Sequence, residues 1–125
     1  MIRTRILTTI KVNSKIMSKY HLGEFEEIVL LTVAILRDEA YGIAIIDEME
    51  SRLNRKVSIG ALQTVLRRLE KKSYLTSEFG EATKMRGGKR KRFFSLTAYG
   101  RKVLTDVKEQ RMGLWSAVPE FAFSY

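Results

Sequence analysis

Six cationic side chains fall within nine residues of this 125-residue chain, and no acidic residue lies among them. They are Lys84, Arg86, Lys89, Arg90, Lys91 and Arg92. Like charges at this density repel one another, and a polyanion that neutralises them removes that cost. Six phosphate contacts would give the affinity a logarithmic salt slope of about −5. The segment therefore favours contact with nucleic acid over a solvated loop or a localisation signal.

A second polar group recurs at helical spacing between positions 60 and 71. At 100° per residue, one arc of such a helix is small at its start and cationic further on. The arc holds Gly60, Thr64, Arg67 and Lys71, with Gln63 and Arg68 on its flanks. A helix that enters the major groove needs this order, because large side chains at its start would block close approach. An ordinary solvated helix face explains the pattern equally well.

Catalytic and metal chemistry have few residues to use. The chain has no cysteine, and His21 is its one histidine, without a serine or carboxylate partner at motif spacing. We therefore expect no enzyme, no metal site and no cofactor. No run of 18 apolar residues occurs, so we expect no membrane span, and the lack of cysteine fits a cytoplasmic protein.

Apolar periodicity predicts the elements that position these residues. We expect helices over residues 24–36, 41–53 and 58–72, a hairpin of strands 75–79 and 92–96, and a last helix over 98–118. Ser58 and Thr97 are the expected N-caps of the third and last helices, and Val57 is an expected short extended link. The hairpin carries the basic segment at its tip. The fold is then mainly α with a small β-hairpin.

The two ends of the chain differ in character. Residues 1–20 hold five cations and no acid, which predicts a disordered tail or a biological start at Met17, with a transit peptide as the alternative. The apolar stripe of the last helix reaches Trp115 and continues through residues 121–125. It either folds back on the first helix or pairs with a second copy, and the second option covers more apolar surface.

Several blocks of the sequence resemble the PadR family in order and spacing. They are residues 58–62 (SIGAL), 66–70 (LRRLE), 75–77 (LTS), 86–94 (RGGKRKRFF) and 96–101 (LTAYGR), and the resemblance spans about residues 22–118. It implies a winged helix-turn-helix transcription regulator. In this fold the third helix reads DNA, the hairpin is the wing, and the first and last helices form a dimer.

Two residues depart from the family's pattern. Gln63 stands where the family usually has a tyrosine that packs on the DNA backbone, so its amide would instead bond to a phosphate or an adenine. Ser73 stands in place of a glycine, where a helix end prefers left-handed backbone geometry. Some relatives bind aromatic effectors between subunits, and Trp115 either lines such a cavity or is a core or interface aromatic.

Together these features predict a four-part chain: a tail (1–20), a winged DNA-binding domain (21–97), a dimerisation helix (98–118) and a short tail (119–125). We expect DNA contacts from Ser58, Gln63, Thr64, Arg67, Arg68, Lys71, Lys84, Arg86, Lys89, Arg90, Lys91 and Arg92. We expect dimer contacts from Phe25, Ile28, Leu31, Val107, Leu114 and Trp115.

The leading hypothesis is a homodimeric repressor on a pseudo-palindromic operator, with its reading helices about 34–36 Å apart. Gln63, Thr64 and Arg67 would read base edges. Lys71, Lys89, Arg90 and Arg92 would contact phosphates. A small aromatic effector is compatible with this role. The alternative is an interaction module whose basic wing binds RNA or an acidic protein.

Overall fold

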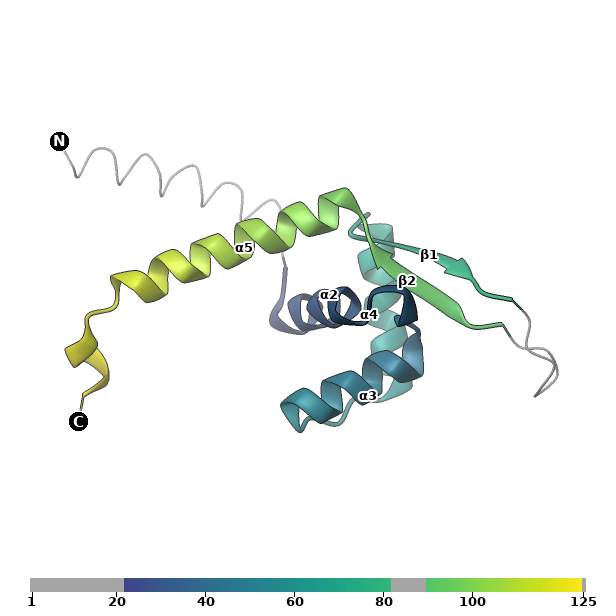
Figure 1. Cartoon of the computed structure of the whole chain (residues 1–125), viewed down its shortest axis with the longest axis horizontal. Helices are drawn as coiled ribbons and strands as arrows, with labels where there is room; N and C mark the ends of the chain where they lie inside the picture. Colours follow the sequence, from purple (N-terminus) through teal and green to yellow (C-terminus); the bar gives the residue numbers. More distant parts are fainter. Residues whose placement is uncertain (1–21, 82–89, 125) are drawn as a thin grey trace.

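The computed structural model describes residues 22–81 and 90–124. Its elements are α2 (Glu24–Leu36), the 3-10 turn η1 (Arg37–Glu39), α3 (Gly42–Leu53), α4 (Ile59–Lys71), β1 (Leu75–Phe79), β2 (Arg92–Leu96), α5 (Ala98–Ala117) and the 3-10 turn η3 (Glu120–Phe123) (Figure 1). The predicted architecture, three helices followed by a hairpin and a closing helix, is confirmed. The expectations for residues 1–20 and for Lys84, Arg86 and Lys89 lie outside the described residues.

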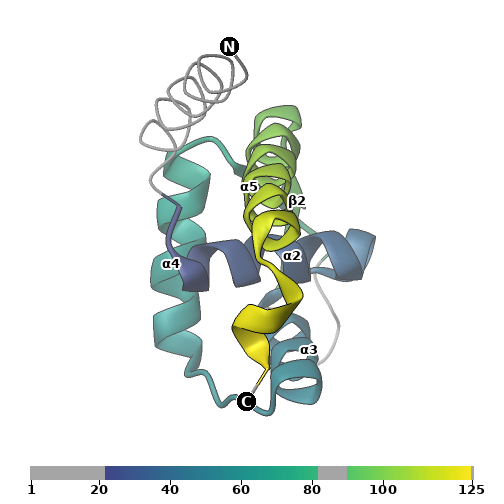
Figure 2. The ribbon, with the colours of Figure 1, turned by 90° about the vertical axis from the view of Figure 1, so that its left-hand side faces the viewer.

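The core lies where α2, α3 and α4 meet the hairpin and the first half of α5. Its fully buried side chains come from every one of these elements: Val29, Leu30, Val33, Ile45, Met49, Leu62, Leu66, Leu69, Leu75, Val103 and Val107. Figure 2 shows α5 crossing over α2, with α4 and α3 on either side. Burial of these aliphatic chains is the main force that holds α4 in place.

Both predicted N-caps are confirmed. The Ser58 hydroxyl accepts a 3.1 Å hydrogen bond from the Ala61 amide at the start of α4. The Thr97 hydroxyl accepts a 2.9 Å hydrogen bond from the Gly100 amide at the start of α5. Each cap satisfies an amide that the helix itself leaves without a partner, so each fixes where its helix begins.

Ser73 adopts the left-handed backbone expected after a helix, with φ of 67°. The following residue, Tyr74, donates from its amide to the Leu69 carbonyl, and the Thr97 hydroxyl donates 2.6 Å to the Ser73 carbonyl. The turn from α4 into β1 is therefore formed without a glycine, because neighbouring backbone and side-chain groups hold it.

The hairpin pairs antiparallel, with Leu75 opposite Leu96 and Phe79 opposite Arg92. The expected short extended link at Val57 is not a strand; its half-buried side chain packs on the core between α3 and α4. A different residue, Ala40, makes a backbone hydrogen bond to the hairpin: its carbonyl accepts a 2.8 Å bond from the Phe94 amide. This bond ties the segment before α3 to β2.

α5 begins on the winged domain and ends away from it. Near its start, Gly100 lies so close to Tyr74 that a Cβ would overlap the Tyr74 carbonyl. Near its middle, Arg111 donates a 2.7 Å bond to the Glu27 carboxylate on α2. From there every described residue to the end is exposed, and Figure 1 shows this half of α5 extending from the body.

Candidate nucleic-acid interface

α4 presents two contrasting faces. Leu62, Val65, Leu66 and Leu69 are buried in the core. The rest of the helix surface is exposed from Ile59 to Lys71, apart from the half-buried Glu70. No side chain covers Gly60, because a Cβ built there would meet no atom within 4 Å. The start of α4 is therefore open to close approach, as the sequence predicts for a helix that enters a groove.

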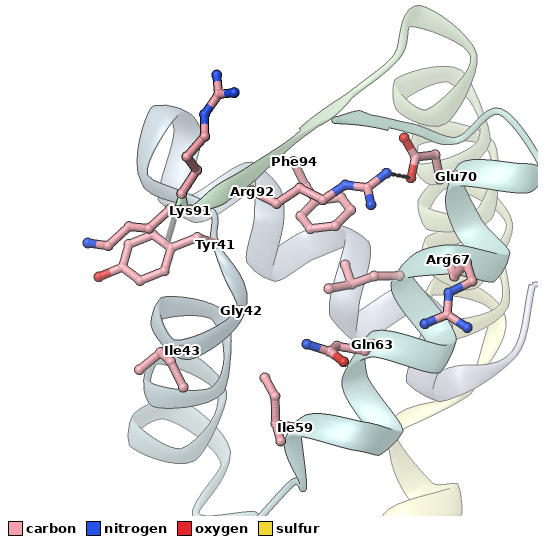
Figure 3. A pocket seen from close by; sticks show the side chains of 12 residues that line it. Tyr41, Gly42, Ile43, Ile59, Gln63, Arg67, Glu70, Lys91, Arg92 and Phe94 are labelled. Atoms are coloured by element: carbon pink, nitrogen blue, oxygen red, sulfur yellow. Dashed lines mark hydrogen bonds and ion pairs between the residues drawn. The ribbon is translucent and has the colours of Figure 1, made fainter. Parts of the chain in front are cut away.

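A hollow of about 660 Å³ lies between the start of α3, the exposed side of α4 and β2 (Figure 3). We call it the α4–wing hollow. It is lined by Tyr41, Gly42, Ile43, Ile59, Gln63, Leu66, Arg67, Glu70, Arg90, Lys91, Arg92 and Phe94. Five predicted DNA contacts, Gln63, Arg67, Arg90, Lys91 and Arg92, thus meet at one site although up to 29 positions separate them in sequence.

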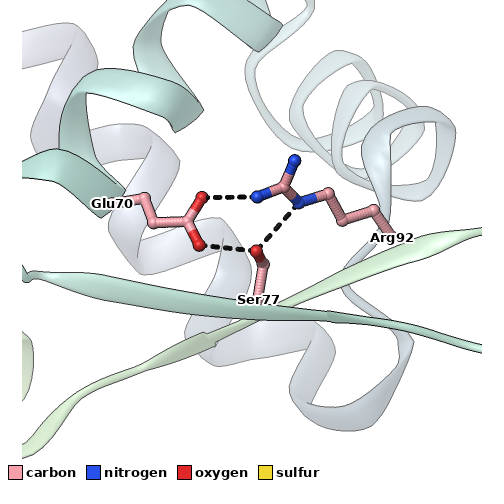
Figure 4. Close-up of polar contacts among 3 residues, drawn as sticks. All are labelled: Glu70, Ser77 and Arg92. Atoms are coloured by element: carbon pink, nitrogen blue, oxygen red, sulfur yellow. Dashed lines mark hydrogen bonds and ion pairs between the residues drawn. The ribbon is translucent and has the colours of Figure 1, made fainter.

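One of these cations is already engaged within the chain. The Arg92 guanidinium donates from Nη2 to Glu70 Oε1 at 2.9 Å and from Nε to the Ser77 hydroxyl at 2.8 Å. Ser77 in turn donates 2.6 Å to the other Glu70 oxygen (Figure 4). This closed triangle links β2, β1 and α4. Arg92 therefore fixes the position of the wing against α4, a role that its charge alone did not indicate.

Arg90 and Lys91, the other two cations in the described part of the hairpin, rest on aromatic rings. The Lys91 ammonium lies 4.2 Å from the centre of the Tyr41 ring, and Tyr41 also contacts Phe93 edge to face. Arg90 donates 2.7 Å to the Gly80 carbonyl and lies over Phe79. Such contacts hold a cation without neutralising it. Their charge stays available to an anion.

Of the other predicted contacts within the described residues, Thr64, Arg68 and Lys71 lie on α4 and Ser58 caps its start, all outside the residues that line the hollow. The Thr64 hydroxyl donates back to the Gly60 carbonyl, and Arg68 stands close enough to Glu26 on α2 to act on its pKa. Within the described ranges, no acidic side chain forms an ion pair with Arg67, Lys71 or Lys91. No acidic side chain of the described residues neutralises the charge of these three cations.

The lining residues that were not among the predicted contacts include Tyr41, Ile43, Ile59 and Glu70. Glu70 follows Gln63 by seven residues, two turns along the same side of α4, which is a signal the sequence does carry. The two residues from the start of α3 had no such signal. Only the crossing of α3 and α4 brings them to the hollow.

Glu26 joins α2 to the end of α4. Its carboxylate accepts 3.1 Å from the Gly23 amide and 2.9 Å from the Lys72 ammonium. Burial raises the pKa of this carboxyl, but the bonds from Gly23 and Lys72 and the Arg68 charge together hold the pKa below its ordinary value of 4.5. The contact stabilises the orientation of α4 from the side opposite the hollow.

The expected dimer contacts fall into three groups. Phe25 and Ile28 are half-buried against the core, and Leu31 is 45% exposed on α2. Val107 is 1% exposed and belongs to the core of the single chain, so it offers no surface to a second copy and that expectation is corrected. Leu114 and Trp115 are 72% and 67% exposed.

Within residues 22–81 and 90–124 the structure contains neither a metal-binding cluster nor a membrane-spanning helix. The Asp and Glu side chains of these residues form no group of three or more that could hold a metal ion. None of their helices has the length and apolar content to cross a bilayer.

Known structures share this arrangement. A PadR-like transcription factor from Bacteroides fragilis matches with a TM-score of 0.64 and 25% identity, over 82% of this chain and 93% of the other. A PadR family regulator from Eggerthella lenta matches over the whole of both chains, with a TM-score of 0.60 and 22% identity. One from Bacillus cereus has a TM-score of 0.64 and 20% identity, over 87% and 98% of the two chains.

No curated protein matches the chain. The family described as transcriptional regulator PadR-like matches residues 30–106, which is more than half of the sequence and includes every residue that lines the hollow. The resemblance inferred from the sequence blocks is thereby confirmed. This chain belongs to the PadR-like family of transcriptional regulators, whose members are DNA-binding transcription factors and not enzymes.

Proposed function

We propose that the protein is a sequence-specific repressor that binds its operator through the α4–wing hollow and the surface around it. The observation that carries this proposal is the convergence of Gln63, Arg67 and Lys91 on one hollow beside the open start of α4. A major groove about 12 Å wide admits a helix that carries small residues at its start. The uncompensated cations then face the phosphates on either side.

The proposed contacts divide by reach and chemistry. Gln63, Thr64 and Arg67 read base edges from α4, since amide and guanidinium groups can make paired bonds to adenine and guanine. Lys71, Arg90 and Lys91 contact phosphates, which position the protein but carry little sequence information. Ser58 and Arg68 lie on the rim of this surface, and Lys84, Arg86 and Lys89 extend the proposed phosphate contacts along the chain. Arg92 contributes to the positive electrostatic potential of the surface while its bonds to Glu70 and Ser77 fix the hairpin against α4.

We also propose that two copies pair through the outer half of α5. Its exposed apolar side chains are large and continuous with those of η3: Met112, Leu114, Trp115, Val118, Phe121 and Phe123. A soluble monomer rarely leaves such a patch open to water. A two-fold pair would place the two α4 helices on successive turns of a pseudo-palindromic operator.

The test is selection of bound duplexes from a random pool, followed by fluorescence anisotropy across a range of salt concentrations. Enrichment of an inverted repeat with a steep salt slope supports the proposal. A steep slope without enrichment reduces the protein to a nonspecific polyanion binder. Binding to an acidic protein or to RNA that survives DNase treatment, with no selected duplex, would favour the interaction-module alternative. Repression itself is tested by transcription in vitro from a promoter that carries the selected repeat.

An aromatic effector is a secondary part of the proposal. Trp115 stacks on Phe123 with ring centres 5.9 Å apart, and both rings are exposed in the single chain. A planar ligand could take the place of one ring when two such pairs meet. Trp115 is the one tryptophan of the chain, so quenching of its fluorescence by added aromatic carboxylates reports directly on this site. Unchanged fluorescence and unchanged operator affinity would reject it.

A further inference from the structure

Two large apolar side chains stand exposed in the α4–wing hollow. Ile43, in the first turn of α3, is 56% exposed, and Ile59, the first residue of α4, is 42% exposed. Neither belongs to the buried core. The isoleucines make an apolar spot between Arg67 on α4 and Lys91, which directly precedes β2. Water contact at such a spot is unfavourable unless a ligand covers it.

The two isoleucines lie at the starts of α3 and α4, which meet across the hollow. A Cβ built on Gly42 would lie 3.2 Å from Cδ1 of Ile59, so the bare backbone of α3 lets the Ile59 side chain lie alongside it. Figure 3 shows Ile59 and Gln63 pointing into the same space from successive turns of α4, with Ile43 on the first turn of α3 across from them. An amide and an aliphatic group are therefore offered together, about one helical turn apart.

An A·T base pair presents this combination of groups in the major groove. Adenine offers an acceptor at N7 and a donor at N6, which a glutamine amide can bond as a pair. Its partner thymine offers a C5-methyl group, which binds apolar side chains. A G·C pair has no methyl group on this edge, and it would leave the isoleucines against polar atoms.

We propose that Ile59, flanked by Ile43, contacts a thymine methyl group beside the adenine that Gln63 bonds, which makes this end of the hollow selective for A·T pairs. The inference rests on the proposed operator binding and specifies what one part of the surface reads. Cationic neighbours supply charge complementarity to the phosphates of the same groove. The occupant is duplex DNA in particular, because RNA has uracil without the methyl group and a major groove too deep and narrow for side chains.

The direct test replaces thymine by deoxyuridine in the duplex selected for operator binding, which removes only the methyl groups. The wild-type protein should bind the substituted duplex about fourfold more weakly for each buried methyl group. Positions can then be restored to thymine one at a time, and one position in each half-site should recover the loss. Equal affinity for the thymine and deoxyuridine duplexes overturns the inference while the proposed operator binding stands. Failure to select any duplex rejects both.

A double variant assigns the effect to these side chains. Ile43→Ala with Ile59→Ala should bind the thymine duplex several-fold more weakly and should no longer distinguish it from the deoxyuridine duplex. The matched control is Ile35→Ala with Leu53→Ala, which removes two aliphatic chains of similar exposure, 45% and 47%, that do not line the hollow. The control should keep the full deoxyuridine effect. If the Ile43/Ile59 variant keeps it too, the methyl group is read elsewhere and the inference is wrong. Circular dichroism establishes that both double variants fold. The comparison of the thymine and deoxyuridine duplexes uses the wild-type protein, so it tests the inference even if a variant fails to fold.

Discussion

Glu70 of α4 holds Arg92 of β2 through a 2.9 Å ion pair, and both side chains also bond to Ser77 (Figure 4). The pair lies between the reading helix and the wing. Its side chains are 29% and 47% exposed, so water weakens it, yet its geometry sets how the two DNA-facing elements stand relative to one another. Arg92, which the sequence predicts to contact a phosphate, therefore also fixes the position of the hairpin against α4.

The first prediction distinguishes a structural role for Arg92 from phosphate binding by Lys91. Arg92→Ala should lower the free energy of unfolding by about 0.5–1 kcal/mol, because a half-exposed pair and its shared hydroxyl are lost. Its salt slope for DNA should stay that of the wild type. Lys91→Ala loses its contact with the Tyr41 ring, which is worth at most about 1 kcal/mol, and should reduce the slope by about 0.9, the value of one phosphate. Urea unfolding and anisotropy at several salt concentrations measure both quantities.

Glu70→Gln provides the control for the same relationship. It keeps the size of the side chain and one of its two acceptor oxygens but removes the charge, so the bond to Arg92 can persist in neutral form and the stability loss should be smaller than that of Arg92→Ala. If Arg92→Ala instead reduced the salt slope as much as Lys91→Ala and left stability unchanged, Arg92 would be a phosphate contact as its charge first suggested.

The second prediction concerns Arg67, which lines the hollow without an ion pair among the described residues. Arg67→Ala should weaken binding to the selected duplex by about 1–3 kcal/mol and relax the preference at one base pair of each half-site. Lys71→Ala, on the same helix but outside the hollow, should weaken all duplexes alike. Competition with single-base variants of the duplex measures the difference. A uniform loss for Arg67→Ala would contradict base reading.

Local patterns in the sequence predicted the elements and much of the site. Ser58 and Thr97 act as caps because the first amides of a helix have no partner within it and a hydroxyl just before the helix can accept from them. This interaction depends on neighbouring residues alone, so the sequence predicts it. Gln63 and Arg67 could be placed on the open side of α4 for a similar reason, since helical periodicity fixes the faces of a helix.

Contacts between distant residues were not predictable in this way. Ala40 joins the hairpin through a single backbone bond to Phe94, and backbone bonds leave no mark in side-chain types. The apolar stripe of α5 is continuous in sequence, yet Val107 faces the core and Trp115 faces water. Only the point at which α5 leaves the body, near Arg111, decides where burial ends.

The third prediction uses two glycines of α5. Gly100→Ala should destabilise the fold by about 1–3 kcal/mol or more, because its Cβ would overlap the Tyr74 carbonyl and the backbone cannot yield as a side chain can. Gly113→Ala, in the same helix with no atom within 4 Å of the new Cβ, should stabilise by up to about 1 kcal/mol. Thermal unfolding compares the two. A neutral Gly100→Ala would mean that α5 does not start against Tyr74 in solution.

The fourth prediction is a pH dependence of stability through Glu26. Because the pKa of this carboxyl is lowered in the folded chain, its contribution is complete above the ordinary value of 4.5 and is lost as the pH falls through the lower folded value. Glu26→Gln should cost about 1–2 kcal/mol at pH 7 and should flatten the loss of stability below about pH 5. Glu24→Gln, at a side chain that is 77% exposed, should cost less at pH 7. Urea unfolding from pH 7 to 3 gives both profiles, and parallel profiles for wild type and Glu26→Gln would contradict this role.

The fifth prediction addresses the outer half of α5. Trp115→Asp should convert the proposed dimer into a monomer, because a carboxylate cannot be buried unpaired among the aromatic and aliphatic chains of a second copy. The winged domain should stay folded, since Trp115 is 67% exposed and lies outside the core. Light scattering coupled to size exclusion gives the mass, and circular dichroism reports the fold.

Leu53→Glu is the matched control, because it also places a carboxylate on an exposed aliphatic position, 47% exposed at the end of α3. It should keep the mass of the wild type. The monomeric Trp115→Asp should bind one half-site with unchanged base preference but lose most affinity for the full inverted repeat, since the second half-site no longer adds to the first. A wild-type protein that is already monomeric at micromolar concentration, or a Trp115→Asp variant that remains dimeric, would place the interface elsewhere.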